Sequence, residues 1–508
     1  MDMPLPTLIL ALLSPARHAP GVTRVDLVQT HISWVLLAGD FAYKIKKPVV
    51  LPFLDFSTLP KRQRYCGDEL RLNRRFAPNL YLEVVGIYNT PEDPQWEGTG
   101  APIEYAVKMR RFDEAGRLDH MCARGDLRPK HLSDLADTLV SLHEAAAVAP
   151  PDSRFGSAAS ILGPAQDNFA DVLRFFPEAE VKTRLAALRT WTEVQFAQLA
   201  PLMAARKQAG RVRECHGDLH LGNIVLIGQR VQMFDCLEFN DDLRWIDVAS
   251  DIAFTYVDLL AHQQPGLANW FLNEVLSRSG DYEAARVLRF YAVYRAMVRA
   301  KVAAIRTSQT RDDGREVLAY IALAEQLLAQ LPLQLVITHG LSGCGKTVAS
   351  NALLQTDPHA ATLRLRSDVE RKRLFGLTGT ARSGSALDGG IYTADAHART
   401  YAHLGKLATE LLNAGWSVIV DAAFLQRAER DHFCSLAQLA GAGFSILAPQ
   451  ATPEQLRERI ESRRVVGTDA SEATLDVLAK QMATLQPLAP DEPVWPALAW
   501  PPSTAAST

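Results

Sequence analysis

The hydrophobic pattern of residues 25–112 predicts a small, β-rich lobe. A charged amphipathic segment over 58–75 predicts a helix. The turn pair Gly39-Asp40 predicts a β-hairpin formed by the strands on either side of the turn. Residues 1–13 are apolar but lack a basic stretch and contain two prolines, so they predict a first helix or strand rather than a signal peptide. Apolar runs of strand length predict the strands of the lobe: 32–38, 41–46, 82–87 and 105–109.

A longer, helical pattern follows the small lobe. Alanine- and leucine-rich runs with helical spacing fill about 130–205 and 245–330. Between them, two short apolar runs at 224–227 and 231–234 flank a turn at 228–230 and predict a second hairpin. The predicted boundaries are 1–330 for a bilobal domain, about 25–112 for its small lobe and about 113–330 for its helical lobe.

After a short linker near 331–333, predicted strands and helices alternate. This alternation predicts a parallel sheet with helices on both faces, in a second domain over 331–490. A tail rich in proline and alanine follows at 491–508, and we expect its last residues to be disordered. The fold class is therefore α/β and α+β in two domains. The predicted strands of the second domain are 334–340, 361–367, 417–423 and 443–448.

Composition excludes several classes of protein. The chain is 48% hydrophobic and 22% charged, as in ordinary globular proteins, and its net charge of -3 gives no bulk attraction to nucleic acid or anionic membranes. Six scattered cysteines without a C-x-x-C pair argue against a disulfide framework or a zinc site. No uninterrupted apolar run could span a bilayer. We expect a cytoplasmic protein without a membrane partner, and the sequence gives no indication of its oligomeric state.

Residues 340–347, Gly-Leu-Ser-Gly-Cys-Gly-Lys-Thr, fit the pattern G-x-x-x-x-G-K-[ST]. An apolar run precedes them and a helical run follows, which is the strand-loop-helix order of a phosphate-binding loop. Glycines let backbone N–H groups point at phosphate oxygens, and the helix N-terminus adds its positive dipole end. Lys346 would reach the β- and γ-phosphates, and Thr347 would ligate Mg²⁺. The predicted ATP-binding residues are Gly340, Ser342, Gly343, Cys344, Gly345, Lys346 and Thr347.

A second phosphoryl-transfer pattern lies at residues 215–224, Cys-His-Gly-Asp-Leu-His-Leu-Gly-Asn-Ile. Asp218 can accept a proton from a substrate hydroxyl. Asn223, five residues on, and Asp235, beyond the short hairpin, can hold Mg²⁺ on the phosphates. This is the division of labour in protein-kinase catalytic loops, so the first domain also predicts a kinase.

The motif H-G-D-L-H-x-x-N, followed by an aspartate after a hairpin, resembles the aminoglycoside phosphotransferase and choline kinase group, which is kinase-like in fold. The resemblance covers roughly residues 25–310. It implies that Asp218 is the catalytic base and that Asn223 and Asp235 are metal ligands. His216 and His220 would either orient the loop or make structural hydrogen bonds. Nothing in the sequence marks a substrate pocket, and the glycine-rich G-x-G-x-x-G loop of many kinases is missing.

Two further features of this domain are interpreted through the same resemblance. The lysine that meets the α- and β-phosphates would lie on the early strand, where Lys44 and Lys46 share one face; Lys44 fits the family pattern better. Its partner on the next helix would be Glu69, although both charges could also be solvated. Asp247 and Asp251 lie four residues apart on one helix face, and we expect them to brace the catalytic loop; metal ligation is the alternative.

The second domain resembles polynucleotide-kinase-like and zeta-toxin-like P-loop kinases at the motif Ser-Asp-x-x-Arg, residues 367–371. This resemblance implies that Asp368 activates the acceptor hydroxyl and that Arg371 binds the substrate; a helix N-cap role for Asp368 is the alternative. Asp421 ends a buried strand and would hold the Mg²⁺ shell. A charged helix at 453–464 carries Arg459 and Arg463 on one face, as an arginine-bearing lid over ATP or as a salt-bridged surface helix.

The whole chain resembles bacterial fusions of an aminoglycoside-phosphotransferase-like domain with a P-loop kinase domain, often labelled AAA-family ATPases. This implies an ATP- and Mg²⁺-dependent phosphotransferase with two active sites that act on hydroxyl acceptors, most simply small molecules. A regulatory ATP-binding protein, in which one domain gates the other, is one alternative. A nucleic-acid 5′-hydroxyl kinase is another, since five basic residues could meet phosphates: Arg364, Arg366, Arg371, Lys372 and Arg373.

Overall fold

The computed structural model divides the chain into two compact units. The first unit comprises residues 1–127, 141–164 and 200–255, and the second comprises 128–140, 165–199 and 256–508. Each unit is described by itself. The residues that the structure describes are 5–51, 54–310, 312–379, 381, 389–466 and 474–495.

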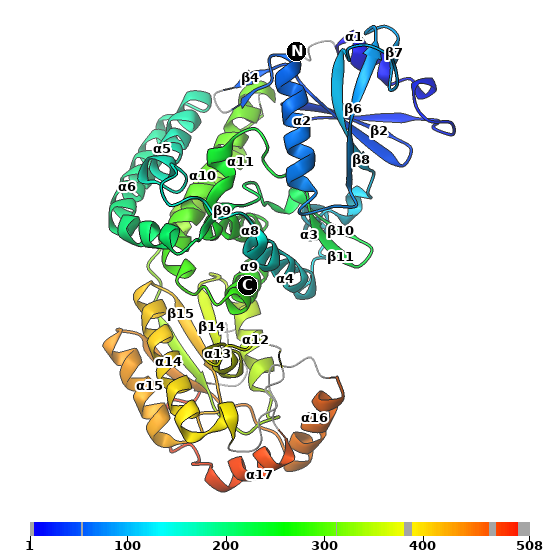
Figure 1. Cartoon of the computed structure of the whole chain (residues 1–508). Coiled ribbons are helices and arrows are strands. Elements are labelled where there is room, and N and C mark those ends of the chain that lie inside the picture. Colours follow the sequence, from blue (N-terminus) through cyan, green and yellow to red (C-terminus); the bar gives the residue numbers. More distant parts are fainter. Residues whose placement is uncertain are drawn as a thin grey trace, which may run out of the picture. The chain divides into compact units, whose positions relative to one another are not determined.

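The first unit is built on a six-stranded sheet with the order β1-β2-β3-β8-β6-β7 (Figure 1). Strands β1, β2, β3, β8 and β6 pair antiparallel with their neighbours. The hairpin β2–β3 pairs Ala38 with Phe41 across the predicted Gly39-Asp40 turn. The strand bounds are β1 Val25–Gln29, β2 Ser33–Ala38, β3 Phe41–Lys46, β6 Tyr81–Asn89, β7 Pro94–Gln95 and β8 Glu104–Arg110; β4 Val50–Leu51 and β5 Leu54–Asp55 form a separate pair.

The two faces of this sheet carry different cores because side chains alternate along each strand. On one face, Leu36 and Ile45 pack with Ile9 and other residues near helix α1 (Thr7–Leu12). On the opposite face, Val107 packs with Cys66 of helix α2 (Leu59–Asn73), which lies along the sheet in Figure 1. The alternation of β3 thus directs Lys44 and Lys46 toward the side covered by α2.

Two short hairpin-like pairs complete the polar region of the first unit. Strand β9 (Val212–Glu214) pairs with β12 (Trp245–Asp247), and β10 (Ile224–Ile227) pairs with β11 (Arg230–Met233). Neither β9 nor β12 was expected, because a three-residue strand leaves no periodicity to detect; β12 replaces the predicted start of a helix at 245. Remaining elements here are the 3₁₀ turns Pro15–Arg17, Glu114–Gly116 and Leu221–Asn223, and helices α3 Leu118–Ala123 and α7 Asp241–Arg244.

Long helices follow the predicted helical pattern. Four of them contribute residues to both units: α4 Pro129–Ala145, α5 Ala158–Phe175, α6 Ala179–Gln208 and α8 Val248–Ala261. Three more belong wholly to the second unit: α9 Pro265–Ser279, α10 Ala284–Thr310 and α11 Arg315–Gln326. Within the described ranges, no helix is both long and apolar enough to cross a bilayer.

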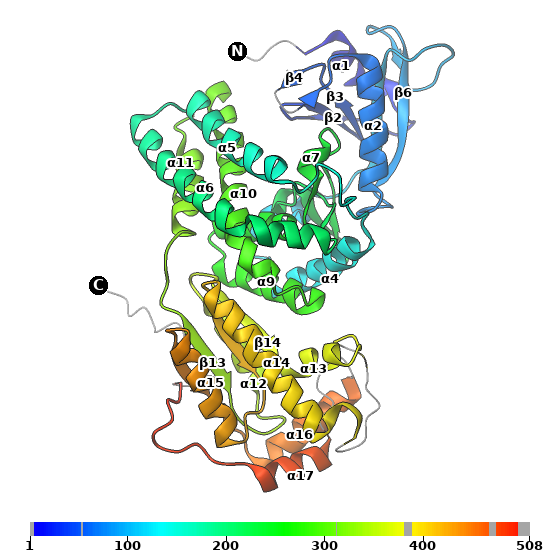
Figure 2. The same cartoon turned by 60° about the vertical axis from the view of Figure 1, so that its left-hand side comes forward.

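The second unit also contains the predicted parallel sheet, in the order β14-β15-β13-β16. Helices α14 and α15 cover one face and α12 lies on the other, as Figure 2 shows. The bounds are β13 Gln334–Thr338, α12 Lys346–Thr356, β14 Thr362–Arg366, α13 Ser367–Leu374, a 3₁₀ turn Gly390–Tyr392, α14 Ala394–Asn413, β15 Ser417–Asp421, α15 Arg427–Leu439, β16 Gly443–Leu447, α16 Pro453–Val466 and α17 Leu475–Thr484.

Helix α9 packs against both α12 and β14, on the face of the sheet that α12 covers. The approach is close: a Cβ at Gly266 would lie 1.9 Å from the Gln355 carbonyl oxygen. Asn269 donates a hydrogen bond to Leu354 O at 3.0 Å. A helix that precedes the P-loop domain in sequence is therefore part of that domain's packing. At the other edge, Ile446 of β16 pairs with residues 493 and 495 of the predicted tail; residues 496–508 lie outside the described part.

Candidate active sites

In the first unit, two lysines of β3 meet one glutamate of α2. The Nζ atoms of Lys44 and Lys46 lie 2.8 Å and 2.6 Å from different oxygens of Glu69. Lys44 also pairs with Asp235, and Lys46 pairs with Glu238. The two candidates for the phosphate-contacting lysine therefore share Glu69 and differ in their second carboxylate. Only Lys44 contacts the predicted metal ligand.

These pairs set the charge states of the cluster. Burial opposes the charge of Lys44, but Asp235 and Glu69 outweigh it and hold the pKa of Lys44 well above its ordinary value. Burial also opposes ionisation of Asp235 and Glu69, but Lys44 outweighs it and lowers the pKa of both carboxyls. Burial raises the pKa of Glu238 in spite of Lys46. A cationic lysine thus lies beside an ionised aspartate, as a site for metal-bound phosphates requires.

The predicted catalytic loop lies between β9 and β10. The Asn223 amide donates to the Asp218 carbonyl oxygen at 2.9 Å and to the Asp218 carboxylate at 3.2 Å. His220 Nδ1 accepts from the Gly222 N–H at 3.1 Å, so the proton of the neutral ring is on Nε2, 3.7 Å from the Asp218 carboxylate. Asp218 is partly exposed. The loop therefore brings the predicted base and one predicted metal ligand into direct contact, with room for a hydroxyl to approach.

Below the loop, His216 and Asp251 make structural contacts. His216 Nε2 lies 2.9 Å from the Phe234 carbonyl oxygen, and burial lowers the pKa of His216, which keeps the ring neutral. The backbone N–H groups of His216 and Gly217 donate to the Asp251 carboxylate at 3.2 Å and 2.9 Å, and His143 meets it at 3.0 Å. Asp251 thus braces the loop through its backbone, as expected from its place on the following helix.

Two other polar clusters near the loop are structural as well. Arg206 binds both oxygens of Asp247, at 2.7 Å and 2.8 Å. The ligand atoms of His143, Cys215 and Asp251 lie within 4.8 Å of one another, a spacing that a metal ion could use. Burial, however, raises the pKa of the Cys215 thiol well above its ordinary value, and the Asp251 oxygens already accept backbone N–H groups. We assign this trio to the support of the loop.

Asp235 is held in an unusual backbone conformation, with a φ of 62°. Non-glycine residues adopt this left-handed region rarely. Two buried side chains from other parts of the chain hold it. The Tyr81 hydroxyl accepts from the Asp235 N–H at 3.0 Å, and the Asn73 amide oxygen accepts from the Cys236 N–H at 2.8 Å. No sequence signal marks Tyr81 or Asn73, because each acts through a contact between distant segments.

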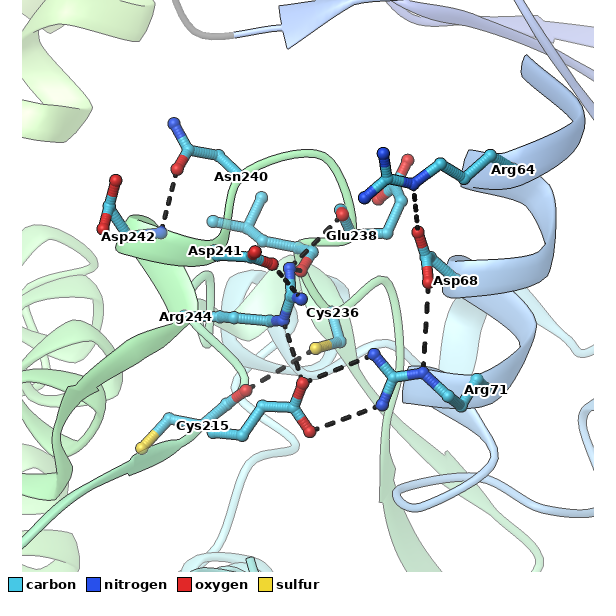
Figure 3. A network of polar contacts seen from close by, with 12 residues as sticks. Arg64, Asp68, Arg71, Cys215, Cys236, Glu238, Asn240, Asp241, Asp242 and Arg244 are labelled. Carbon is cyan, nitrogen blue, oxygen red and sulfur yellow. Dashed lines mark hydrogen bonds and ion pairs between the residues drawn. The ribbon is translucent and has the colours of Figure 1, made fainter. Parts of the chain in front are cut away.

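A network of arginines and carboxylates connects α2 with β9 and α7 (Figure 3). Arg71 and Arg244 share Glu214, at 3.4 Å and 3.2 Å, and Asp68 lies 3.6 Å from Arg64 and 4.0 Å from Arg71. A polar cavity of about 400 Å³ opens beside the network. Its basic and acidic lining groups all have ion-pair partners, so we interpret the network as a brace that fixes α2 against the segment after Asp235.

In the second unit, the loop after β13 has the backbone of a phosphate-binding loop. Gly340, Gly343 and Gly345 have φ angles of 133°, 89° and 103°, in the region that glycine adopts most readily. Lys346 Nζ donates to the carbonyl oxygens of Gly340 and Leu341, both at 2.8 Å. The lysine therefore folds over its own loop, at the N-terminus of α12.

Thr347, in the first turn of α12, faces Asp421 at the carboxyl end of β15. The hydroxyl oxygens of Thr347 and Ser350 lie 3.0 Å and 3.2 Å from one Asp421 carboxylate oxygen. Hydroxyl and carboxylate oxygens are hard ligands of the kind Mg²⁺ prefers, so the donor set of Thr347 and Asp421 fits the predicted ion. Ser350 is a further member of this cluster that the sequence pattern did not single out.

Arg364 of β14 connects this cluster to α9. Its guanidinium donates to Ser350 Oγ at 3.2 Å, and its backbone N–H donates to the Asn273 amide oxygen at 2.6 Å. Asn273 also donates to the Thr362 carbonyl oxygen at 2.9 Å. A continuous chain of hydrogen bonds therefore runs from α9 through Arg364 and Ser350 to Asp421.

Helices α16 and α17 both contact the loop. Arg459 of α16 donates to the Gly343 carbonyl oxygen at 3.2 Å, so its side chain lies against the loop. The amide oxygen of Gln481, on α17, accepts from the Ser342 N–H at 2.8 Å, a contact without any sequence signal. The side chain of Arg463 lies outside the described residues.

Asp368 and Arg371 lie on α13, which directly follows β14. The helix begins at Ser367 and no side chain caps it, so Asp368 is a first-turn residue and not the cap that the alternative required. Arg364, Arg371 and Lys372 are only 5%, 7% and 1% exposed. The predicted basic cluster is therefore not a surface patch, because strand alternation and helix packing turn most of it inward. This removes the main support for a nucleic-acid kinase.

Comparisons with known proteins identify two separate domains in the chain. Residues 56–288 match the phosphotransferase enzyme family, and residues 335–488 match an AAA domain. Uncharacterized proteins of Mycobacterium tuberculosis and Mycobacterium bovis are each 28% identical over 460 residues, which is 90% of this chain and 90% of the relative. The similarity to these relatives therefore spans both domains.

Solved structures are similar to each half separately. A choline/ethanolamine kinase family protein from Mesorhizobium loti is 14% identical and covers 63% of this chain and 95% of its own, with a TM-score of 0.38. A gluconokinase from Sinorhizobium meliloti is 21% identical and covers 33% of this chain and 87% of its own, with a TM-score of 0.23. At these scores, neither likeness bears on a substrate.

Proposed function

Because the chain joins a domain of the phosphotransferase enzyme family to an AAA-type P-loop domain, we propose that it is an ATP- and Mg²⁺-dependent phosphotransferase with two nucleotide sites. Each site would transfer the γ-phosphoryl group of ATP to a hydroxyl acceptor. One observation carries the proposal: in each unit, a lysine amine and oxygen ligands suited to Mg²⁺ lie together. They are Lys44 with Asp235, and Lys346 with Thr347 and Asp421.

In the first site, Asp218 would accept the proton of the acceptor hydroxyl. The hydroxyl oxygen would form a bond to the γ-phosphorus of ATP while the bond from that phosphorus to the β,γ-bridging oxygen breaks, and ADP would leave. Lys44 would leave Asp235 for the phosphate oxygens, and Glu69 would keep it in place. Asn223 and Asp235 would hold Mg²⁺, which supplies charge neutralisation on the phosphates. Asp251 and His216 contribute by holding the loop rigid.

In the second site, Asp368 would accept the proton of the acceptor hydroxyl in the same phosphoryl-transfer step. Lys346 would exchange its two carbonyl partners for phosphate oxygens. Thr347 and Asp421 would hold the metal ion. Arg459, which already lies against the loop, would add a positive charge that stabilises the negative charge of the phosphates in the transition state.

The test is a nucleotide-binding and transfer assay on the full chain. We expect two tight sites for a Mg²⁺-bound ATP analogue per chain, and only one tight site after Lys346→Ala. In the Lys346→Ala background, Asp218→Asn should lower the remaining ATP turnover by about 10²–10⁴-fold while binding persists. Labelled ATP with metabolites, sugars, nucleosides and 5′-hydroxyl oligonucleotides would identify acceptors.

Asp242→Asn provides a matched control, since the Asp242 carboxylate pairs with the exposed Arg154 and not with a residue of the predicted catalytic loop. Unchanged nucleotide binding in Lys346→Ala, or full turnover in the double variant, would contradict the assignment of the respective site. A change in turnover at both sites after a single substitution would instead favour the alternative function, in which one domain gates the other.

A further inference from the structure

Arg371 of α13 is a buried cation without a buried anion. The residue is 7% exposed, and among the described residues it forms no ion pair. One nitrogen donates to the Ile391 carbonyl oxygen at 3.2 Å, and its Nε has no hydrogen-bond partner. The guanidinium carbon lies 5.3 Å from the centre of the Tyr392 ring. A neutral carbonyl and a ring face do not neutralise a buried charge.

Two other buried arginines of the chain bind carboxylates. Arg62 binds Glu104, with nitrogen-to-oxygen distances of 2.8–3.0 Å. Arg430 binds Glu492 at 2.6 Å and 3.1 Å. Because a guanidinium fork matches a carboxylate or a phosphate, Arg371 has the chemistry of a binding group for an external anion.

A cluster of groups that can bind hydroxyls includes Tyr401, which is close enough to Arg371 for the two to interact electrostatically. His397 Nε2 is 2.6 Å from Glu429, and the His397 ring stacks on Tyr401 with centroids 4.3 Å apart. The Tyr401 hydroxyl accepts from the Phe424 N–H at 3.2 Å and keeps its own proton to donate. Burial, with Glu429 adding to it, raises the pKa of Tyr401, and the charges of Arg371 and Asp368 also act on it. A histidine, a carboxylate and a phenol are typical partners of substrate hydroxyls.

These groups converge at the carboxyl ends of two adjacent parallel strands. Asp368 and Arg371 follow β14, and Phe424 follows β15, which pairs with it. Ligands of parallel α/β sheets bind outside this edge. Phe424 also has a φ of 46°, a strained conformation for a residue with a side chain, of the kind that clusters at functional sites.

We propose that the acceptor of the P-loop site is a small hydroxylated anion, with its carboxylate or phosphate bound by Arg371 and its hydroxyls bound by Tyr401 and the His397–Glu429 pair, beside Asp368. This assignment rests on the proposed kinase function of the domain. It adds the charge class of the acceptor and three hydroxyl-binding groups, Tyr401, His397 and Glu429, for which the sequence pattern gave no signal.

The test compares anionic probes with neutral probes of the same hydroxyl content. The full chain carries Asp218→Asn and is saturated with a non-hydrolysable ATP analogue and Mg²⁺. Binding of gluconate against sorbitol, glycerate against glycerol, and ribose 5-phosphate against ribose is measured by calorimetry. We expect the anion of at least one pair to bind about tenfold or more tightly than its neutral counterpart. The carboxylate and phosphate pairs distinguish the two sources of the anionic group.

Two variants separate the roles of the residues. Arg371→Met should abolish the preference for the anion while the ATP analogue still binds. His397→Ala, at a side chain that is 44% exposed and so tolerant of change, should weaken both members of a pair about equally. Lys406→Met, an exposed position of the same helix, is the matched control and should change neither. If Arg371→Met fails to fold, the proposal is still tested by whether the parent prefers the anionic probe and whether His397→Ala weakens both probes of a pair equally.

The proposal is overturned if neutral probes bind as tightly as anions, if no anion binds up to about 10 mM, or if Arg371→Met retains the preference. Failure of the underlying function has a different signature: the ATP analogue then binds the Lys346→Ala variant as well as the parent. The two failures are therefore distinguishable in one set of titrations.

Discussion

The two candidate phosphate sites hold their lysines in different ways. Lys44 lies between the carboxylates of Glu69 and Asp235, both ionised. Lys346 donates to two neutral carbonyl oxygens of its own loop. Phosphate would therefore displace a charged partner at the first site and neutral partners at the second. Carboxylates compete with phosphate for a lysine more strongly than neutral carbonyl oxygens do, so freeing the lysine costs more free energy at the first site.

The sites also differ in how they are assembled along the chain. Lys44 and Asp235 are 191 residues apart, whereas Lys346 and Leu341 are 5 apart. The first site exists only when β3, α2 and the segment after β11 are folded together. The second is set largely by one loop. Substitutions at the first site should therefore change stability as well as binding, and those at the second should change binding alone.

The largest expected effect tests this difference directly. Lys44→Ala would remove one cation from the buried Glu69 and from Asp235, whose side chain is 42% exposed, and should lower the free energy of unfolding by about 2–4 kcal/mol. Lys346→Ala should leave it within about 1 kcal/mol and instead weaken nucleotide binding about 10- to 100-fold. Urea denaturation and nucleotide titration of the two variants measure both quantities.

Lys61→Ala is the control for loss of a lysine, because Lys61 pairs with Asp55 at the surface, where an ion pair contributes about 0–1 kcal/mol. Equal destabilisation by Lys44→Ala and Lys346→Ala would show that the two sites are not supported differently, and the comparison would fail.

Sequence patterns predicted the local parts of both sites and missed the long-range ones. Asp218 and Asn223 stand five residues apart, and the P-loop is one contiguous motif, so both were visible. Tyr81 and Asn73, which hold the backbone at Asp235, have no motif because they act across more than 150 residues. The four strands of the second domain were predicted within two residues of their ends, since buried parallel strands give clear apolar runs.

Burial of polar residues was the harder quantity to predict. The arginines and lysines from 364 to 373 were the basis for the alternative of a nucleic-acid kinase, but they alternate between the sheet interior, helix contacts and the site edge. Packing of α9 on the P-loop sheet was also invisible, because helical periodicity shows that a helix has an apolar face without showing what covers it.

The second prediction concerns this use of α9 by the P-loop domain. Gly266→Ala should destabilise the second unit by about 1–3 kcal/mol, since the new Cβ would lie 1.9 Å from the Gln355 carbonyl oxygen and α9 would have to move. The unfolding transition, followed by the fluorescence of Trp416, whose indole donates to Ala285 O within this unit, reports it. Nucleotide affinity at Lys346 should fall with it, because Asn273 moves with α9.

Gly163→Ala is the matched control, since Gly163 is also helical but has nothing within 4 Å of its new Cβ. Alanine has the higher helix propensity, so this variant should be neutral or up to about 1 kcal/mol more stable. If both substitutions behave alike, α9 is not tightly packed on the P-loop domain, and the second site is as local as its motif suggests.

The third and smallest effect sharpens the comparison through pH. The catalytic loop of the first site is held by an ionised group, Asp251, which accepts the N–H groups of His216 and Gly217. The P-loop is held by a neutral one, the Gln481 amide, which accepts the Ser342 N–H. Burial opposes ionisation of Asp251, but the hydrogen bond from His143 outweighs it and lowers the pKa of Asp251 to about 2.

A lowered folded-state pKa means that Asp251 contributes stability above its unfolded-state pKa of about 3.9, and that this contribution is lost as the pH falls toward 2. The contribution is about 2 kcal/mol, so Asp251→Asn should flatten the acid branch of the stability curve by that amount. Gln481→Ala should leave the acid branch unchanged, because an amide does not titrate. An acid branch that is equally steep in the parent and in Asp251→Asn would show that the charge of Asp251 does not hold the loop. The contrast between a charged and a neutral support would then be wrong for the loops, even if it holds for the lysines.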